Sequence, residues 1–305
     1  MLKAKNSANL SKNSKILIGF AAFLTFSYFL SFTKSCSSQD KREKIRTALV
    51  NQKYRESISS FELVDAGASL TINKRGNFWA ICDKEGKAII PASSERLDSL
   101  TENLITIRNL YKISDKIGQN STFGLTNGTE FHLRYYTENT FHELVFGNQD
   151  FSLSSRYLMT EKSTQVYEID SSLDSYLSTS IQNWAEAFII SQQVLGKINP
   201  EDIQRAQVID YESNHLSSIS DLQKLLDLRH GGIPDDDQEL SSPLSLITLE
   251  LGNKNEIELE IYESSKENEF IVLTNYKTQK EAQPVFTSKA KISSWTYNKI
   301  KEITL

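Results

Sequence analysis

Apolar side chains recur at helical spacing in two short segments of the chain. This spacing of three and four residues predicts two amphipathic helices, one that begins at Ser93–Ser94 and one that begins near Ser220. Ser220 and Gln223 have the spacing of a capping box, in which each side chain accepts a backbone N–H of the other residue. The apolar positions are Leu97, Leu100, Leu104 and Ile107 in the first helix and Leu222, Leu225 and Leu226 in the second.

Alternation of apolar and polar residues predicts two β-hairpins. In the first hairpin, residues 131–135 pair with 142–146, which places Arg134 opposite Glu143 in a favourable cross-strand ion pair. In the second hairpin, a turn at 252–255 joins two strands that each carry apolar residues on one face. The pairs expected there are Leu251 with Ile257, Leu249 with Leu259, and Glu250 with Glu258.

The order of the elements predicts an internal repeat. We expect an α+β fold of two related units of mostly antiparallel sheet with helices packed on one face, preceded by a single transmembrane helix. The expected segments are an N-terminal tail and anchor at 1–35, a juxtamembrane stalk at 36–56, a first unit at 57–196 and a second unit at 197–305. The spacing of Val166–Tyr167, Leu173 and Tyr176 returns at Val285–Phe286, Ile292 and Trp295. Further strands are expected at 60–73, 77–82, 156–159, 206–211 and 270–274, with a helix or strand at 183–193 between the units.

The segment 16–32 is apolar and uncharged, and four lysines precede it. A helix of this length reaches across the hydrocarbon core of a bilayer, for which about 17–25 residues are needed. The short basic tail favours a cytoplasmic N-terminus. We therefore expect a single-pass protein of the cytoplasmic (inner) membrane with its body on the extracytoplasmic side. Five basic residues between positions 34 and 46 leave the opposite orientation open.

Two other interpretations of the N-terminus remain open. A lipoprotein signal would end at Cys36 and attach a lipid there, although Lys34 fits such a signal poorly. A cleaved signal peptide would need a small-x-small site, which does not follow the segment. A disulfide between Cys36 and Cys82 is also possible in an oxidising compartment.

The charge of the body excludes one class of partner. Residues 1–35 hold five lysines and no acid, which leaves 29 basic and 39 acidic residues and a net charge of −10 in the rest of the chain. A surface of this sign repels phosphate backbones, so we expect no binding to nucleic acid.

No catalytic constellation or cofactor motif stands out, so we expect a protein that is not an enzyme. One loop is a weak candidate for a divalent cation, because carboxylate oxygens are suitable ligands. Consecutive carboxylates point in different directions, however, and the alternative is a solvated turn in which Gly231 or Gly232 caps the preceding helix. The candidate ligands are His230, Asp235, Asp236 and Asp237.

Histidine and tryptophan offer two further candidates. His132 and His142 lie in one hairpin, but its register places them on opposite faces, where they cannot share a metal. Trp79, Trp184 and Trp295 are candidates for a ligand-stacking surface, although large aromatic residues are more often core residues.

Several short segments resemble a bacterial family known as domain of unknown function 4340, over most of residues 57–305. The most recognisable are a Phe-Gly-Leu step and a strand that ends in Gly147. The chain departs from the family in having Thr126–Asn127–Gly128 where many members have a proline, and its second unit lacks a clear Gly-Leu step. The segments that carry the resemblance are Phe78–Trp79, Pro91–Ser94, Phe123–Gly124–Leu125, Leu144–Val145–Phe146–Gly147, Arg156–Tyr157–Leu158 and Val166–Tyr167–Glu168–Ile169.

The resemblance implies a single-anchor envelope protein, because members of the family are of this kind and some are encoded near gliding-type ABC transporter components. We therefore expect a membrane-tethered, non-enzymatic interaction or accessory protein with protein partners in the envelope. The alternatives are a module that binds a glycan or peptide between the two repeats, or a surface lipoprotein.

Overall fold

The structure of the chain is a computed structural model. It describes residues 23–25, 42–115, 121–126, 128–137, 140–160, 164–211, 213–234, 240–281 and 283–304. The predicted anchor lies outside these residues except at 23–25, which are helical, and Cys36 lies outside them too. Within the described ranges, no helix has the length and apolarity needed to cross a membrane.

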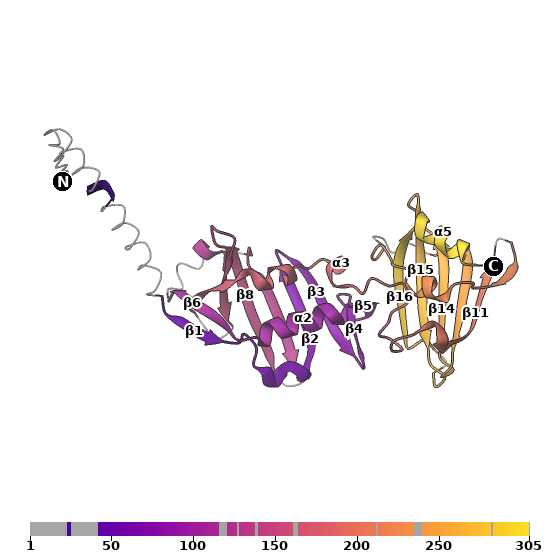
Figure 1. The fold of residues 1–305 in the computed structure, drawn as a ribbon, viewed down its shortest axis with the longest axis horizontal. Coiled ribbons are helices and arrows are strands. Elements are labelled where there is room, and N and C mark those ends of the chain that lie inside the picture. The colour runs from indigo at the N-terminus through magenta and orange to yellow at the C-terminus, as the bar shows by residue number, and fades with distance from the viewer. Residues whose placement is uncertain are drawn as a thin grey trace, which may run out of the picture.

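Two antiparallel sheets with few helices make up the described chain (Figure 1). The ten-stranded sheet has the order β1-β6-β10-β9-β8-β7-β2-β3-β4-β5, and the six-stranded sheet has the order β12-β11-β13-β14-β15-β16. The strands of the first sheet are β1 (Lys44–Thr47), β2 (Ile58–Asp65), β3 (Ala68–Arg75), β4 (Phe78–Cys82), β5 (Ala88–Pro91), β6 (Arg108–Ser114), β7 (Phe131–Thr137), β8 (Phe141–Gln149), β9 (Ser155–Thr160) and β10 (Val166–Asp170). Those of the second are β11 (Ile203–Asp210), β12 (His215–Ser218), β13 (Ser245–Leu251), β14 (Glu256–Glu263), β15 (Glu269–Lys277) and β16 (Phe286–Ser293).

The helices are short and cover the apolar faces of the sheets (Figure 1). The longest, α2, lies across the ten-stranded sheet, and α5 packs on the six-stranded sheet. The α-helices are α2 (Ser94–Ile105), α3 (Ile181–Trp184), α4 (Leu222–Leu226) and α5 (Ser294–Glu302). Among the described residues, 3₁₀ turns include Gln52–Ser57, Ser171–Tyr176 and Pro200–Asp202.

Helix α2 has the start that the sequence predicts but an earlier end. The Ser93 side chain caps the helix by accepting the Arg96 N–H (3.3 Å). The Thr106 hydroxyl donates to the Glu102 carbonyl (2.7 Å) in the last turn, and the chain turns extended at Thr106. Ile107 therefore lies beyond the helix and is 61% exposed, so its expected place on the apolar face is wrong. The buried apolar residues of α2 are Leu97, Leu100, Leu104 and Ile105.

Helix α4 also forms, but a different residue caps it. Asp221, one position after the predicted Ser220, accepts the Lys224 N–H (3.0 Å). The Ser220 hydroxyl instead donates to the Ile303 carbonyl (2.7 Å), which ties the start of α4 to the end of α5. The predicted capping box is therefore wrong, because Ser220 is used in a tertiary contact.

One predicted hairpin is confirmed and the other has a different register. In the β7–β8 hairpin, Arg134 lies opposite Glu143 and the two side chains are 2.7 Å apart. In the β13–β14 hairpin, Leu249 pairs with Ile257, two residues away from the predicted register. A three-residue loop closes this hairpin, with Lys254 in the left-handed region at φ +62°. A shift of two keeps the apolar residues on the expected face.

Other expectations need correction. The segment predicted as one strand at 60–73 is two strands with a turn at Ala66–Gly67, where both residues have positive φ. Part of the predicted stalk forms β1, which pairs with β6 at the edge of the ten-stranded sheet. In the connecting segment predicted at 183–193, only 183–184 are helical, as the end of α3. The two sheets differ in strand number, and Ile292 lies in a strand whereas Leu173 lies in a 3₁₀ turn, so the repeat stays a prediction.

Candidate functional site

A strip of backbone hydrogen bonds joins the two sheets between their edge strands β5 and β16. At one side, the Glu186 N–H donates to the last residue of β5 (2.9 Å). In the middle, the His230 N–H donates to the Ala187 carbonyl (3.0 Å). At the other side, the Gly231 N–H donates to the Lys291 carbonyl of β16 (2.7 Å). Both edge strands therefore have hydrogen-bond partners, which lowers their tendency to pair with other chains.

The His230 side chain, predicted as a metal candidate, belongs to this junction. Its Nε2 lies 2.6 Å from the Glu186 carbonyl, and its Nδ1 accepts the Gly232 N–H (3.0 Å). Since a carbonyl only accepts and an N–H only donates, the ring is neutral with its proton on Nε2. Burial lowers the pKa of His230, in agreement with a neutral ring.

The other predicted metal ligands, Asp235, Asp236 and Asp237, lie outside the described residues. Among the residues that the structure does describe, no three His, Cys, Asp or Glu side chains come close enough together to hold a metal ion. The two glycines do not cap the preceding helix, which ends at Leu226. Gly231 and Gly232 pair with β16 instead.

A buried carboxylate lies at the centre of the junction. Glu186 is 7% exposed and accepts the Ser191 hydroxyl (2.6 Å), the Gln192 N–H (2.8 Å) and the Gln193 side-chain amide (3.1 Å). The Ser191 N–H in turn donates to the hydroxyl of Tyr276 on β15 (2.6 Å). Burial raises the pKa of Glu186, and the hydrogen bonds oppose that rise. The only sequence signal for this network is a single carboxylate within the apolar run 184–190.

Side chains fill the space between the sheets. Ala80 of the first sheet packs in the core of the second, and Ala290 of the second packs in the core of the first. Trp184 of α3 is fully buried beside them. A ligand between the two sheets, as in one alternative from the sequence, would have to displace these residues.

The three tryptophans do not share a surface. Trp184 is buried, and Trp79 packs against Phe61 with ring centroids 5.7 Å apart. Trp295 is 66% exposed on α5, and the Lys299 ammonium lies 5.8 Å from its ring centroid.

Trp295 borders a hollow of about 520 Å³ between α4 and α5. The hydrogen bond from Ser220 to the Ile303 carbonyl ties its two walls together. The hollow combines an open aromatic ring with carboxylates and ammonium groups, so it can stack a flat ring and exchange hydrogen bonds with hydroxyl groups. Its charged residues are Asp221, Lys224, Asp227, Lys299 and Glu302.

The two histidines of the first hairpin lie on opposite faces, as predicted. His132 Nδ1 lies 2.9 Å from the Glu143 carboxylate, in the same cluster as Arg134. The ring of His142 stacks on Tyr135 with centroids 4.7 Å apart. Both histidines have partners that account for them without a metal.

The cysteine that the structure describes is not suited to catalysis or metal binding. Cys82 is a free thiol, 6% exposed in β4. It accepts a hydrogen bond from the side-chain amide of Asn73 (3.4 Å). A buried thiol in apolar surroundings is poorly reactive.

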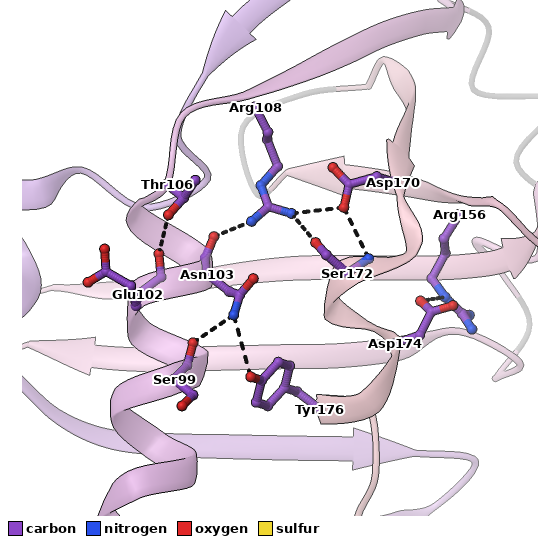
Figure 2. A network of polar contacts seen from close by, with 10 residues as sticks. All are labelled: Ser99, Glu102, Asn103, Thr106, Arg108, Arg156, Asp170, Ser172, Asp174 and Tyr176. Carbon is purple, nitrogen blue, oxygen red and sulfur yellow. Dashed lines mark hydrogen bonds and ion pairs between the residues drawn. The ribbon is translucent and has the colours of Figure 1, made fainter.

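A second buried charge lies at one end of the ten-stranded sheet and was missed from the sequence (Figure 2). Arg108 at the start of β6 is 7% exposed and donates to the Ser172 hydroxyl (2.7 Å) and the Asp170 carboxylate (3.4 Å). It also donates to the Asn103 carbonyl of α2. Desolvation lowers the pKa of Arg108, and Asp170 opposes that fall.

The Arg108 network joins helix α2, strand β6 and the Ser171–Tyr176 turn. Asp170 also caps that turn by accepting the Ser172 N–H (3.0 Å), and Asn103 on α2 reaches the Tyr176 hydroxyl (3.4 Å). Figure 2 shows these groups converging from the three elements. A hollow of about 570 Å³ lies beside the network, but the polar groups mainly satisfy one another. We regard it as a structural clamp.

The Phe-Gly-Leu step packs on β8 at Gly147; the predicted strand end there is wrong, because β8 continues to Gln149. A Cβ on Gly147 would lie 2.1 Å from the Phe123 carbonyl oxygen, so only glycine fits beneath the step. The ring of Phe123 lies 4.8 Å from that of Tyr157 on β9. Leu125 is buried against β8 and β10. Four of the segments that suggested a family resemblance, those at 123–125, 144–147, 156–158 and 166–169, therefore contribute to one packing unit.

The fold and the two polar networks define a class first: an antiparallel β protein of two sheets, in which the buried Glu186 and Arg108 join separate elements. Residues 84–240 match the family described as Domain of unknown function (DUF4340). The match covers just over half of the chain, and the chain belongs to this family. No curated protein and no solved structure matches the chain significantly.

Proposed function

We propose that the chain is a membrane-tethered, non-enzymatic accessory protein of the cell envelope. Residues 16–32 anchor it in the inner membrane, and its acidic body presents its surface to envelope partners on the extracytoplasmic side. An ABC-type, gliding-like transporter assembly is the partner we favour, because the family resemblance points to such a genetic neighbourhood.

The observation that carries this proposal is the state of residues 23–25 within the apolar segment. They are helical, with Phe23 66% and Leu24 54% exposed. Such side chains on an open helix are unfavourable in water and favourable in lipid. Strand β1 begins at Lys44, soon after the predicted anchor, so the tether is short. The eleven residues between 32 and 44 reach at most about 40 Å when extended, which keeps the body near the bilayer surface.

The test is a pull-down of the full-length, C-terminally tagged protein from gently solubilised membranes, with mass spectrometry of its partners and of its own N-terminus. A matched control replaces Phe23 and Leu24 by arginine, each of which costs roughly 3 kcal/mol at the centre of a bilayer. We expect reproducible envelope partners and an intact N-terminus, both lost with the control. A mature chain that begins at a lipid-modified Cys36, or no partner above background, would contradict the proposal.

A second candidate function is supported by the hollow beside Trp295. We infer that, if the protein binds a small ligand, the ligand is a glycan at this hollow rather than between the sheets. An exposed indole ring suits the apolar face of a sugar, and the surrounding carboxylates and ammonium groups suit its hydroxyls.

The test for a glycan is a titration of the full-length protein with envelope oligosaccharides, followed by NMR or calorimetry. Trp295→Ala should abolish the binding. Tyr211→Ala is the control, because Tyr211 is 46% exposed and does not border the hollow. Equal binding by both variants would rule out the hollow as the site.

A further inference from the structure

The loop between β8 and β9, residues 150–154, is closed around one carboxylate. Asp150 Oδ1 accepts the N–H groups of Ser154 and Ser155, both at 3.0 Å. Its Oδ2 accepts the Ser152 hydroxyl (2.6 Å) and N–H (3.2 Å). These bonds, led by that from the Ser152 hydroxyl, lower the pKa of Asp150 to about 2. The loop, called here the Phe151 loop, is therefore held in one conformation by a carboxylate that stays charged.

This conformation directs two apolar side chains away from the protein. Phe151 is fully exposed, and Leu153 is 65% exposed. Leu153 also has a φ of +57°, in the left-handed region that is unfavourable for a leucine. Single exposed apolar residues are ordinary, but two on one five-residue loop with a strained backbone suggest a contact that covers them.

The Phe151 loop lies where the chain arrives from the predicted anchor. Glu168 on β10 accepts both the Arg42 guanidinium (2.6 Å) and the hydroxyl of Ser155 (2.8 Å). Arg42 and Phe151 also border the same hollow, of about 750 Å³. Arg42 is ten positions after the last residue of the predicted anchor, so the loop and the membrane surface are close in space if the anchor is in place.

The charges of the connecting segment favour a lipid surface over a protein. Five basic residues lie between positions 34 and 46, in a body that is acidic as a whole. Basic residues close to a bilayer are attracted to anionic headgroups, by about 1 kcal/mol each. Aromatic and aliphatic side chains beside them are suited to the boundary between headgroups and acyl chains.

We propose that the Phe151 loop inserts Phe151 and Leu153 into the headgroup boundary of an anionic bilayer, on the leaflet where the anchor emerges. This inference rests on the proposed membrane tether. The loop would be a second point of contact that fixes the orientation of the ten-stranded sheet relative to the membrane.

The experiment places a fluorophore on Phe151→Cys in the full-length protein, reconstituted in vesicles of equal parts phosphatidylcholine and phosphatidylglycerol. Cys36→Ser leaves Cys82 as the one native thiol, and Cys82 is buried. Leu216→Cys is the matched control, because Leu216 is 59% exposed on β12, at the far edge of the other sheet. Quenching by a lipid-borne and by a water-borne quencher is compared at the two positions.

We expect a blue-shifted emission and several-fold stronger lipid quenching at position 151 than at position 216. Adding Leu153→Asp should reduce the inserted population at least about tenfold, because a carboxylate is strongly disfavoured in lipid. Water quenching at 151 equal to that at 216 would overturn the inference, and so would protection at 151 that appears only when another envelope protein is added. Flotation of the vesicles after an alkaline wash is scored separately. A chain that does not float with the vesicles contradicts the membrane tether. A chain that floats but is quenched from water at position 151 contradicts only the insertion of the loop.

Discussion

Replacing Gly147 by alanine should release the Phe-Gly-Leu step from the sheet. The new Cβ would lie 2.1 Å from the Phe123 carbonyl oxygen, and real Cβ contacts are not shorter than 3.0 Å. Because the contact is with backbone, the segment 121–125 must move as a whole. The residues it covers with Leu125 are Val145 and Val166, each at most 5% exposed.

The size of the effect follows from this burial. Burying an aliphatic side chain contributes about 2 kcal/mol, so half-exposing three of them lowers the free energy of unfolding by about 3 kcal/mol. The control is Gly252→Ala, where the nearest atom is a flexible side-chain nitrogen 3.5 Å from the new Cβ. It should change the free energy of unfolding by less than about 0.5 kcal/mol. The assay is urea denaturation of the full-length protein in detergent, with hydrogen exchange at 121–125. Equal stability of the two variants would refute the assigned role of Gly147.

Further predictions concern the buried polar groups and Trp295. Arg108→Met should lower the free energy of unfolding by about 2–3 kcal/mol, because it removes the hydrogen bonds from the buried guanidinium to the Asn103 carbonyl, the Ser172 hydroxyl and Asp170. Arg108→Lys should not restore the lost stability in denaturation, since an ammonium lacks the planar fork of the guanidinium. Burial raises the pKa of Glu186 above the ordinary glutamate value of 4.5. Its contribution to stability is therefore fully present below pH 4.5 and is lost as pH rises through the raised pKa. Glu186→Gln should lack this loss when unfolding is measured over a pH series. Burial lowers the pKa of His230, so its contribution is present above pH 6.5 and is lost as pH falls through the lowered pKa; His230→Gln should flatten the profile there. Trp295→Ala should leave the melting temperature within about 2 °C of wild type, since the ring is mostly exposed.

Elements fixed by local spacing could be predicted from the sequence. Helix α2 begins at its serine cap, and the β7–β8 hairpin has the predicted register because its apolar alternation and its Arg134–Glu143 pair agree. The β13–β14 register could not be predicted in the same way, because it depends on Lys254 adopting a left-handed conformation that is unusual for lysine. The turn at Ala66–Gly67 was missed for a related reason, since an alanine precedes the glycine at positive φ.

Contacts between segments that are distant along the chain could not be predicted from the sequence. His230 had the residue type of a metal ligand. Its role in the structure is to hold segment 186–187 against Gly231 and Gly232, which pair with β16. Glu186 and Arg108 gave no motif, because their partners come from several elements. The Phe-Gly-Leu step and Gly147 were noticed only as marks of a family, and their fit to one another is visible only in three dimensions.

The measurement that tests the central claim most directly is the topology of the full-length protein in its own envelope. One sample of membranes is washed at alkaline pH. A separate sample of intact spheroplasts is treated with a protease that cannot cross the inner membrane. The account predicts that the protein stays in the washed membrane fraction and that its body is digested in intact spheroplasts. Release by the wash, or a body that is digested only after lysis, would contradict it.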